Sequence, residues 1–346
     1  MADRITAVPE HYRAFPKVEL HRHLEGTLRL TTMLEVATEH GISIPEDRMR
    51  LSSLVQMQED EGFSFQTFLS KFNTLRLFYR SPEIIDRITR EAVEDAARDH
   101  VRYMELRFTP VALSRAERFP LNDVMDWVIS SAQTAAGQQG ILVRLIASVN
   151  RHESPELAEQ VAWLSAERRD AGLVGIDLAG NEAEFDSDAF YGIFREARQA
   201  GLHITIHAGE WGPAANVREA IEELAAERIG HGVRILEDPS VVQLAAERHT
   251  PFEICVTSNH QSGVIPQPGE HPLAEMLDCG LNATINTDDP SVSRITLSNE
   301  YQTVREVLGL SQAALEGMIL AAGEAAFLPD GERAALVARL KSELEL

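Results

Sequence analysis

The stretch VELHRHLEGT, residues 18–27, places two histidines one residue apart at the end of an apolar run. If this run is a β-strand, alternation puts the side chains of His21 and His23 on one face and that of Arg22 on the other. Two imidazoles on one face are able to ligate a metal ion. Two hydrogen-bonded strand histidines would fit the same pattern, so the rest of the sequence has to decide between these interpretations.

Further histidines and acidic residues stand at the ends of later apolar runs. They are His207 and Glu210 in HITIHAGE, His231 in RIGHGV, and Asp288 and Asp289 in INTDDP. If the runs are parallel strands of a barrel, these positions fall at the end of the barrel where enzymes of this architecture gather their catalytic groups. The spacing therefore favours one shared site.

The residue types in this set suit a catalytic zinc ion. Zinc accepts imidazole and carboxylate ligands, and three histidines with one carboxylate leave a position open for water. His21, His23 and His207 are the expected nitrogen donors, and one of Asp288 and Asp289 is the expected oxygen donor. The other aspartate faces the bound water or caps a following helix.

The chain contains eight short runs that are rich in apolar and β-branched residues. They are KVELHRH (17–23), VRYMELRF (101–108), ILVRLIASV (141–149), LVGIDLAG (173–180), HITIHAGE (203–210), RIGHGVRI (228–235), FEICVTSN (252–259) and NATINTDD (282–289). Segments between the later runs repeat apolar residues at steps of three and four, as helices do; they are 154–172, 186–201 and 216–230. Alternating strands and helices predict an α/β fold, a closed (β/α)8 barrel, with an open doubly wound sheet as the rival.

Two departures from regular spacing predict additions to the barrel. Residues 28–99, between the first two runs, read as several helices with an aromatic-rich face and are expected to form a lid at the active-site end. After residue 296 the chain continues as helices to its end. Because no low-complexity linker interrupts the sequence, we expect residues 1–346 to form a single domain.

Composition limits the partners and the location. The 346 residues contain 32 Lys and Arg against 54 Asp and Glu, a net charge of −22, which disfavours nucleic acid and anionic membranes as partners. There is no apolar leader and no run long enough to span a membrane. Two cysteines are too few for a disulfide framework, so a soluble cytoplasmic protein is expected. The sequence does not determine the oligomeric state.

Several site classes are disfavoured by missing residues. The chain has no C-x-x-C, which the zinc deaminases that act on bases flipped out of nucleic acid require. A two-metal barrel hydrolase would usually need a bridging lysine on the fourth strand, and LVGIDLAG contains none. A single zinc ion per chain is therefore the prediction.

Six motifs in this order, VELHRHLEGT, GIDLAGNE, HAGE, RIGHGV, CVTSN and NTDDP, resemble the motif series of the adenosine deaminase family, in its branch that includes adenosine, adenine and aminodeoxyfutalosine deaminases. The resemblance spans about residues 16–300. It implies that His21, His23, His207 and Asp288 bind the zinc.

The same resemblance implies the catalytic and substrate-binding roles. Glu210 would donate a proton to purine N1, and His231 would orient and deprotonate the zinc-bound water. Asp289 would hydrogen-bond that water or purine N7, and the Gly180 backbone would meet purine N3. Attack at C6 followed by loss of ammonia requires such an acid at N1, and burial can raise the pKa of a glutamate enough to keep it protonated.

The implied reaction is zinc-dependent hydrolytic deamination of a 6-aminopurine, with adenosine and 2′-deoxyadenosine as the expected substrates. Glu25 bears on the choice because many adenosine deaminases carry Asp at this position, which faces the ribose 5′-hydroxyl. Adenine, or a 5′-modified adenosine such as aminodeoxyfutalosine, is the alternative substrate. A non-catalytic purine-binding protein is the alternative from another class. His260 is expected to be an ordinary surface histidine, with contact to the sugar or to a 5′ substituent as the alternative.

Overall fold

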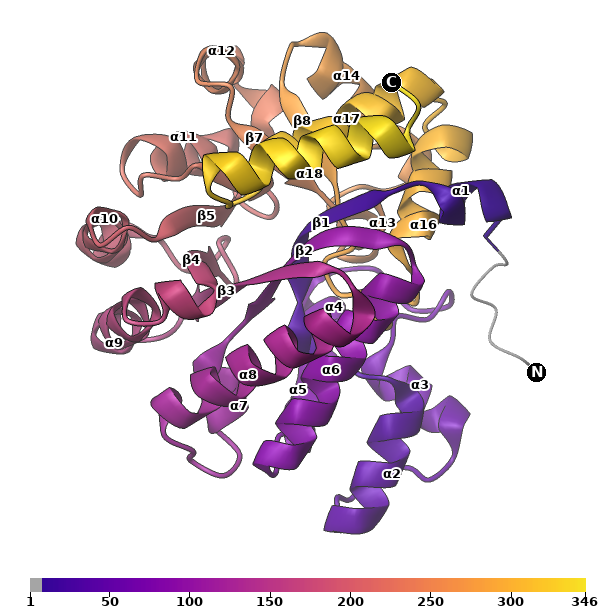
Figure 1. Ribbon diagram of the computed structural model, residues 1–346, viewed down its shortest axis with the longest axis vertical. Coiled ribbons are helices and arrows are strands. Elements are labelled where there is room, and N and C mark those ends of the chain that lie inside the picture. Colours follow the sequence, from indigo (N-terminus) through magenta and orange to yellow (C-terminus); the bar gives the residue numbers. More distant parts are fainter. Residues whose placement is uncertain (1–7) are drawn as a thin grey trace.

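The computed structural model describes residues 8–346 and contains one sheet of eight parallel strands that follow the order of the chain (Figure 1). The strands are β1 (Lys17–His23), β2 (Val101–Phe108), β3 (Leu142–Asn150), β4 (Leu173–Ala179), β5 (His203–Ala208), β6 (Arg228–His231), β7 (Pro251–Ile254) and β8 (Asn282–Ile285). Each strand pairs in parallel with the next one. All eight predicted runs therefore contribute a strand.

The first and last strands meet through a short seam that closes the barrel. Arg22 and Asp288 form an isolated parallel bridge. The backbone N–H of Asp288 donates to the carbonyl of His21, and the N–H of His23 donates to the carbonyl of Asp288, both at 2.9 Å. The predicted barrel is confirmed, and the rival open sheet is excluded by this seam.

Helices surround the strands in an outer ring (Figure 1). The ring contains α6 (Pro82–Arg98), α8 (Leu121–Gln139), α9 (Pro155–Ala166), α10 (Tyr191–Gln199), α11 (Ala214–Glu222), α12 (Pro239–Glu247), α14 (Leu273–Asp278) and α17 (Gln312–Glu324). Three of them begin with a capping side chain followed by proline: Ser81 before α6, Ser154 before α9 and Asp238 before α12. These caps satisfy backbone N–H groups that no helical carbonyl reaches, which explains where the helices start.

The seventh predicted strand is shorter than expected. The run 252–259 was predicted as extended, but β7 ends at Ile254 and α13 (Val256–Gln261) follows directly. The backbone N–H of Asn259 donates to the carbonyl of Cys255, and the Thr257 hydroxyl and N–H donate to the buried Glu300 carboxylate. Short polar side chains thus turn the chain into a helix at the barrel mouth, where they lie close to the predicted site.

The segment between β1 and β2 is helical, as predicted. It contains η1 (Leu24–Gly26), α2 (Leu30–His40), α3 (Arg48–Val55), α4 (Phe65–Ser70), α5 (Phe72–Leu75) and η2 (Arg76–Phe78) before α6. The ring of Phe65 lies 5.4 Å from that of Trp211, and the ring of Phe63 lies 4.9 Å from that of His260. The insertion therefore packs over the chain that follows β5 and β7.

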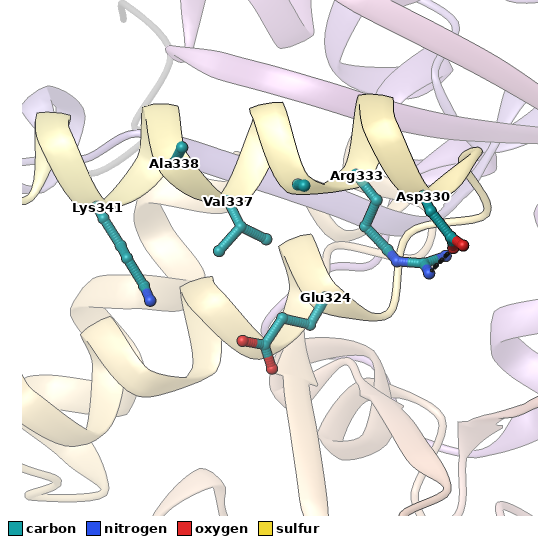
Figure 2. A pocket seen from close by; sticks show the side chains of 7 residues that line it. Glu324, Asp330, Arg333, Val337, Ala338 and Lys341 are labelled. Carbon is teal, nitrogen blue, oxygen red and sulfur yellow. Dashed lines mark hydrogen bonds and ion pairs between the residues drawn. The ribbon is translucent and has the colours of Figure 1, made fainter.

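The remaining elements are short, apart from the last helix. They are α1 (Glu10–Ala14), α7 (Pro110–Ser114), η3 (Arg169–Ala171), η4 (Asp188–Phe190), η5 (Ile235–Glu237), η6 (Pro268–Glu270), α15 (Pro290–Ser293), α16 (Leu297–Gln302), η7 (Thr303–Val307) and α18 (Asp330–Glu343). A hollow between α17 and α18 is lined by Glu324, Arg333, Val337 and Lys341 among others (Figure 2). None of its lining residues belongs to the predicted site.

The turn between α17 and α18 packs against the amino ends of the strands. Arg228, the first residue of β6, donates to the carbonyl of Ala325 at 2.8 Å, and its guanidinium lies 3.5 Å from the centre of the Phe327 ring. Arg228 also pairs with the buried carboxylates of Glu105 and Glu253. The C-terminal helices are thus tied to the barrel interior by one buried cation.

Within residues 8–346, none of the helices combines the length and the apolar character that crossing a membrane requires. The two cysteines carry free thiols, buried at Cys255 and exposed at Cys279.

Replacing Arg228 with methionine should destabilise the fold by about 3–5 kcal/mol, because the buried Glu105 loses its cation and Glu253 keeps only Arg107. Chemical denaturation measures the free energy of unfolding. Arg339→Met, which removes a half-exposed cation paired with Glu343 on α18, is the control and should change the free energy by less than about 1 kcal/mol. Equal effects of the two variants would show that the buried pairs contribute nothing beyond those on the surface.

Candidate metal and catalytic site

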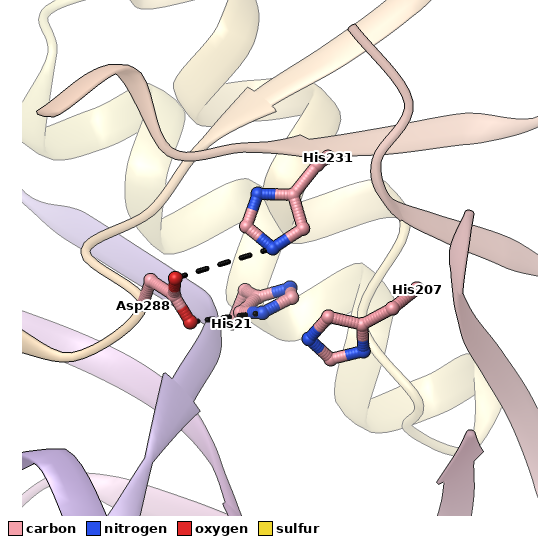
Figure 3. Close-up of side chains that lie close together, drawn as sticks. All are labelled: His21, His207, His231 and Asp288. Atoms are coloured by element: carbon pink, nitrogen blue, oxygen red, sulfur yellow. Dashed lines mark ion pairs between the residues drawn. The ribbon is translucent and has the colours of Figure 1, made fainter. Parts of the chain in front are cut away.

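Side chains from four strands meet at the carboxyl end of the barrel. His21 on β1, His207 on β5, His231 on β6 and Asp288 after β8 point toward one another (Figure 3), and one possible ligand atom from each lies within 4.8 Å of the others. His23, at the end of β1, lies beside them. All four predicted metal ligands are therefore gathered in one place, together with His231, which was predicted to be catalytic.

The four predicted ligands lie close to one another, and His231 lies beside them. Asp288 Oδ1 lies 3.3 Å from His21 Nε2 and 3.4 Å from His23 Nε2, while the Nε2 atoms of His23 and His207 are 3.3 Å apart. His231 Nε2 stands farther off, 4.0 Å from Asp288 Oδ2. Such a group of mutually close imidazoles and one carboxylate suits a shared cation.

Two buried carboxylates orient the metal-facing histidines. Nδ1 of His21 lies 2.8 Å from Glu253 Oε2, and Nδ1 of His207 lies 2.9 Å from Asp177 Oδ1. Because a carboxylate only accepts hydrogen bonds, each Nδ1 carries the proton and each Nε2 keeps its lone pair toward the cluster. His21 Nε2 is buried and has no hydrogen-bond partner among residues 8–346. The residues present therefore fit a zinc ion.

Arg107 on β2 links the two orienting carboxylates. It donates to Glu253 at 2.7 Å and lies 3.4 Å from Asp177, with all three side chains fully buried. Burial alone would raise the pKa of Asp177 and of Glu253. For Asp177, the hydrogen bond from His207 and the charge of Arg107 outweigh burial. For Glu253, the charges of Arg107 and Arg228 do so, and both pKa values are held below the ordinary range.

The sequence analysis did not assign a role to Asp177 or Glu253. Both stand inside apolar runs, LVGIDLAG and FEICVTSN, where a lone acidic residue is unusual. A charged side chain in a strand that is buried on both faces requires a polar partner. The position of each acidic residue within an apolar run could therefore have indicated a contact with a site residue.

His231 is oriented by a chain of hydrogen bonds that starts at a backbone amide. The N–H of Leu273 donates to His271 Nδ1 at 3.1 Å, so Nε2 of His271 carries the proton and donates to Asn259 Oδ1 at 3.2 Å. The Asn259 amide in turn donates to His231 Nδ1 at 3.0 Å. Burial, then the nearby His21, lowers the pKa of His231, so the ring is neutral and presents an Nε2–H group to the site.

Glu210 is a buried carboxyl group and not a solvated one. It follows β5, and its Oε2 lies 3.7 Å from His231 Nε2. Burial, together with the negative charges of Asp288 and Glu182, holds the pKa of Glu210 well above its ordinary value of 4.5. A protonated carboxyl group therefore stands beside the metal cluster, as a general acid requires.

Asp289 faces the cluster and does not cap the helix that follows it. It occupies the N-cap position of α15, but its side chain makes no capping hydrogen bond. Its Oδ1 is buried and has no partner in the described part of the chain. A Cβ at Gly26 would lie 1.9 Å from this oxygen, so glycine is needed there for Asp289 to occupy its position.

The two remaining predicted substrate contacts also lie at strand ends. Gly180 follows β4 with φ of 94°, a left-handed conformation that favours glycine. Glu25 in η1 accepts the backbone N–H of Thr109 at 2.7 Å through Oε1, while Oε2 is buried without a partner among residues 8–346. Burial raises the pKa of Glu25. The Tyr79 hydroxyl, from the insertion, is likewise buried and unpartnered.

His260, which was predicted to be a surface histidine, and Lys71 of the insertion both have structural contacts. His260 packs edge-on against Phe63 and places Nδ1 2.9 Å from the carbonyl of Ile265. Lys71 donates to Glu61 at 2.6 Å and to the carbonyl of Ser53 at 3.0 Å. Lys71 is therefore engaged within the insertion.

A parallel (β/α)8 barrel whose strand ends carry histidines and an aspartate arranged for a cation defines the class of metal-dependent barrel hydrolases. The family model described as adenosine deaminase matches residues 16–343 of this chain. An adenosine deaminase from Klebsiella pneumoniae subsp. pneumoniae is 37% identical over 336 residues, covering 94% of this chain and 98% of that protein.

Solved structures agree with this family. Adenine deaminase from Arthrobacter aurescens has a TM-score of 0.88 at 29% identity, with 96% of this chain and 99% of that chain covered. An amidohydrolase from Burkholderia ambifaria with bound Zn has a TM-score of 0.89 at 29% identity, with 100% and 95% covered. Arabidopsis N6-mAMP deaminase has a TM-score of 0.85 at 30% identity, with 96% and 99% covered.

The chain therefore belongs to the adenosine deaminase family, a family of zinc-dependent hydrolases that act on C–N bonds in cyclic amidines. The resemblance found in the sequence motifs is confirmed.

Replacing Asp177 with asparagine should weaken zinc binding about 10- to 100-fold, because His207 loses the carboxylate that orients it. Competition with a chromogenic chelator measures the zinc affinity without any activity assay. Asp188→Asn, which alters a carboxylate of the outer ring that accepts the Tyr191 hydroxyl, is the control and should leave zinc affinity unchanged. Unchanged affinity in the Asp177 variant would exclude the orienting role.

Proposed function

We propose that this protein catalyses hydrolytic deamination of a 6-aminopurine, with adenosine and 2′-deoxyadenosine converted to inosine and 2′-deoxyinosine plus ammonia. The observation that carries the proposal is the buried Glu210 carboxyl group, whose pKa burial raises, beside a cluster of histidines and Asp288 that fits one zinc ion. Neither the acid nor the cluster alone would specify this reaction.

In this proposal His21, His23, His207 and Asp288 hold the zinc ion, as the family resemblance implies. In support, Asp288 Oδ1 lies within 3.4 Å of Nε2 of both His21 and His23, and the Nε2 atoms of His23 and His207 are 3.3 Å apart. When bound, zinc supplies the Lewis acidity that makes water a nucleophile at neutral pH. His231 stays outside the ligand set, since its Nε2 carries hydrogen and also faces Glu210.

The protein's own residues then act on the purine ring. Glu210 donates its proton to N1, so that the ring accepts the electrons displaced when water adds to C6. One proton of the added water goes to the amino group, which leaves as ammonia. The other returns to the Glu210 carboxylate, so that C6 is left as a carbonyl and the acid is restored. A protonated carboxyl is needed at the start, and the raised pKa of Glu210 meets this condition.

His231 and Asp289 position the attacking water. The Nε2 atom of His231 carries hydrogen and therefore has no lone pair with which to take a proton. We therefore assign His231 the orientation of the water and not its deprotonation. The Oδ1 of Asp289 is unpartnered: as a carboxylate it would accept from the water, and as a protonated carboxyl, which burial favours, it would donate to purine N7. The backbone of Gly180 meets the purine at N3.

The substrate is proposed to be a nucleoside because of the groups around Glu25. Glu25 Oε2 and the Tyr79 hydroxyl are buried polar atoms without a hydrogen-bond partner in the described structure. Leaving such an atom unpaired costs about 1–3 kcal/mol. Ribose hydroxyls would supply those partners. The similarity to an adenine deaminase and to an N6-mAMP deaminase keeps adenine and 5′-substituted adenosines as alternatives.

A 5′-phosphate is less well supported. Lys71 is occupied by Glu61, and Arg76 is a nearby cation without a carboxylate within 4.0 Å in the described structure. Glu25 and Asp289, whose pKa values burial raises, offer carboxyl groups and not cations in the same region. The region therefore lacks the cluster of cations that binds a phosphate dianion.

Two further parts of the proposal concern the whole chain. Residues 28–99 act as a lid of a single domain, since Phe63 and Phe65 pack over the chain after β7 and β5 and would exclude water. We place the protein in the cytoplasm as a reduced enzyme, in keeping with its two free thiols.

Ammonia release and the ultraviolet change on deamination should be measured for adenosine, 2′-deoxyadenosine, adenine, adenosine monophosphate and aminodeoxyfutalosine. We expect the two nucleosides to have the highest kcat/KM. Turnover of adenine alone would exclude the nucleoside assignment. Zinc content without turnover of any of the five would favour a purine-binding protein instead.

Glu210→Gln should lower kcat about 10²- to 10⁴-fold with zinc still bound, because the amide cannot donate an acidic proton to N1. In the unaltered enzyme, kcat/KM should fall as the pH rises through the raised pKa of Glu210, since the acid is then deprotonated. Steady-state kinetics against pH and metal analysis measure both effects. A near-normal rate in the glutamine variant would remove Glu210 from the mechanism.

A further inference from the structure

Glu182, two residues beyond Gly180 in the loop after β4, accepts an unusual number of hydrogen bonds. Its Oε1 accepts the backbone N–H groups of Glu210 at 2.6 Å and Trp211 at 2.7 Å. Its Oε2 accepts the N–H of Gly209 at 3.0 Å and the amide of Asn216 at 2.8 Å. Three consecutive backbone amides thus bind one carboxylate.

This carboxylate is buried, and no cation neutralises it directly. Glu182 is 7% exposed, and within residues 8–346 no Lys, Arg or His nitrogen lies within 4.0 Å of it. A buried charge without a paired cation is costly unless hydrogen bonds satisfy it, and here the loop after β5 provides them. The loop and the carboxylate therefore stabilise each other.

The loop is shaped to receive this side chain. Gly209 has φ of 69°, in the left-handed region, which turns the following N–H groups toward Glu182. A Cβ at Gly212 would lie 2.7 Å from Glu182 Oε2. Glycine at these two positions allows the backbone to wrap around the carboxylate.

One of the three anchored residues is the acid of the proposed reaction. The backbone N–H of Glu210 makes the shortest of the four bonds, so the Cα from which its side chain extends is fixed from the β4 side of the barrel. The Glu210 side chain is held separately by its burial near His231. Proton donation to one ring nitrogen requires a placement of this kind, since a displacement of about 1 Å can cost about 10²-fold in rate.

We propose that Glu182 is a positioning residue for Glu210: its carboxylate clamps the backbone of residues 209–211 and thereby places the acid opposite purine N1. The inference rests on the proposed function, because Glu210 must be the acid. Glu182 itself touches neither the substrate nor the metal ligands in this account.

The negative charge of Glu182 also supports the proposed acid, because it raises the pKa of Glu210. Asp288, after β8, and Glu182, from the β4 loop, both favour the protonated form of Glu210. Hydrogen bonds from Asn259 on α13 and from Ser262 after it favour the charged form. His231 on β6 is neutral and adds no charge. Burial remains the largest cause. The clamp therefore contributes to protonation as well as to position.

The test compares Glu182→Gln with a matched control in the same barrel. The glutamine has the same length but turns an N–H₂ group toward one of the backbone donors, so part of the clamp is lost. Glu227→Gln is the control, because Glu227 accepts the backbone N–H of Ile204 at 3.1 Å at the opposite end of β5. Glu182→Asp, which keeps the charge but shortens the side chain, replaces the glutamine variant if that one does not fold, and the same pattern is expected of it.

We expect Glu182→Gln to lower kcat about 10- to 100-fold with KM and zinc content little changed, while Glu227→Gln keeps kcat within about twofold. Hydrogen–deuterium exchange of the peptide covering 209–211 should accelerate in the Glu182 variant and stay unchanged in the Glu227 variant. This second readout does not depend on activity.

Combination with Glu210→Gln separates positioning from general support of the fold. If Glu182 acts through Glu210, adding Glu182→Gln to Glu210→Gln lowers the residual kcat by less than about twofold. The same fold-loss in both backgrounds, or wild-type kcat in Glu182→Gln with faster exchange, would overturn the inference. Absence of turnover in the unaltered enzyme and the Glu227 variant would instead refute the proposed function, so the two failures are distinguishable.

Discussion

The barrel closes through two backbone hydrogen bonds, and the three residues that form them are proposed metal ligands. Asp288 donates to the carbonyl of His21 and accepts from the N–H of His23. The seam therefore fixes the relative position of three ligand side chains before any ion binds. Asp288 has φ of 64° at this point, a conformation that costs a non-glycine residue free energy and that the surrounding bonds must hold. The same two hydrogen bonds therefore close the barrel and place the proposed metal ligands.

The interior of the barrel accepts this concentration of polar groups because opposite charges are stacked beneath it. Glu253 accepts from His21 on one side and from Arg107 and Arg228 on the other, and Arg228 continues to Glu105 and to the turn at Ala325. A single buried carboxylate without a cation would be protonated or would destabilise the fold, whereas carboxylates that alternate with arginines can stay charged in the interior. The orientation of His21 is in this way connected to the C-terminal helices at the opposite end of the strands.

Much of this was predictable from the sequence, for reasons that differ between elements. The boundaries of β1 and β2 follow from apolar runs that end at polar residues, and both match the predicted ranges. The second half of 252–259 was predicted wrongly as strand, because Thr257, Ser258 and Asn259 form a helical turn through tertiary bonds that local propensity does not contain. Asp177 and Glu253 were not assigned, because an orienting residue is defined by the group it contacts.

The groups proposed to act on the purine ring and the groups expected to select the substrate come from different parts of the chain. Glu210, His231 and Asp288 lie at or just after strand ends, and their positions are set by backbone hydrogen bonds and by buried carboxylates. Glu25 follows β1 in η1, and Tyr79 comes from the helical insertion, where the packing is against side chains and not within a sheet. Changes in the insertion can therefore alter which purine fits without moving the acid or the metal ligands. Relatives with the same barrel and different named substrates, adenine and N6-mAMP, are consistent with this separation.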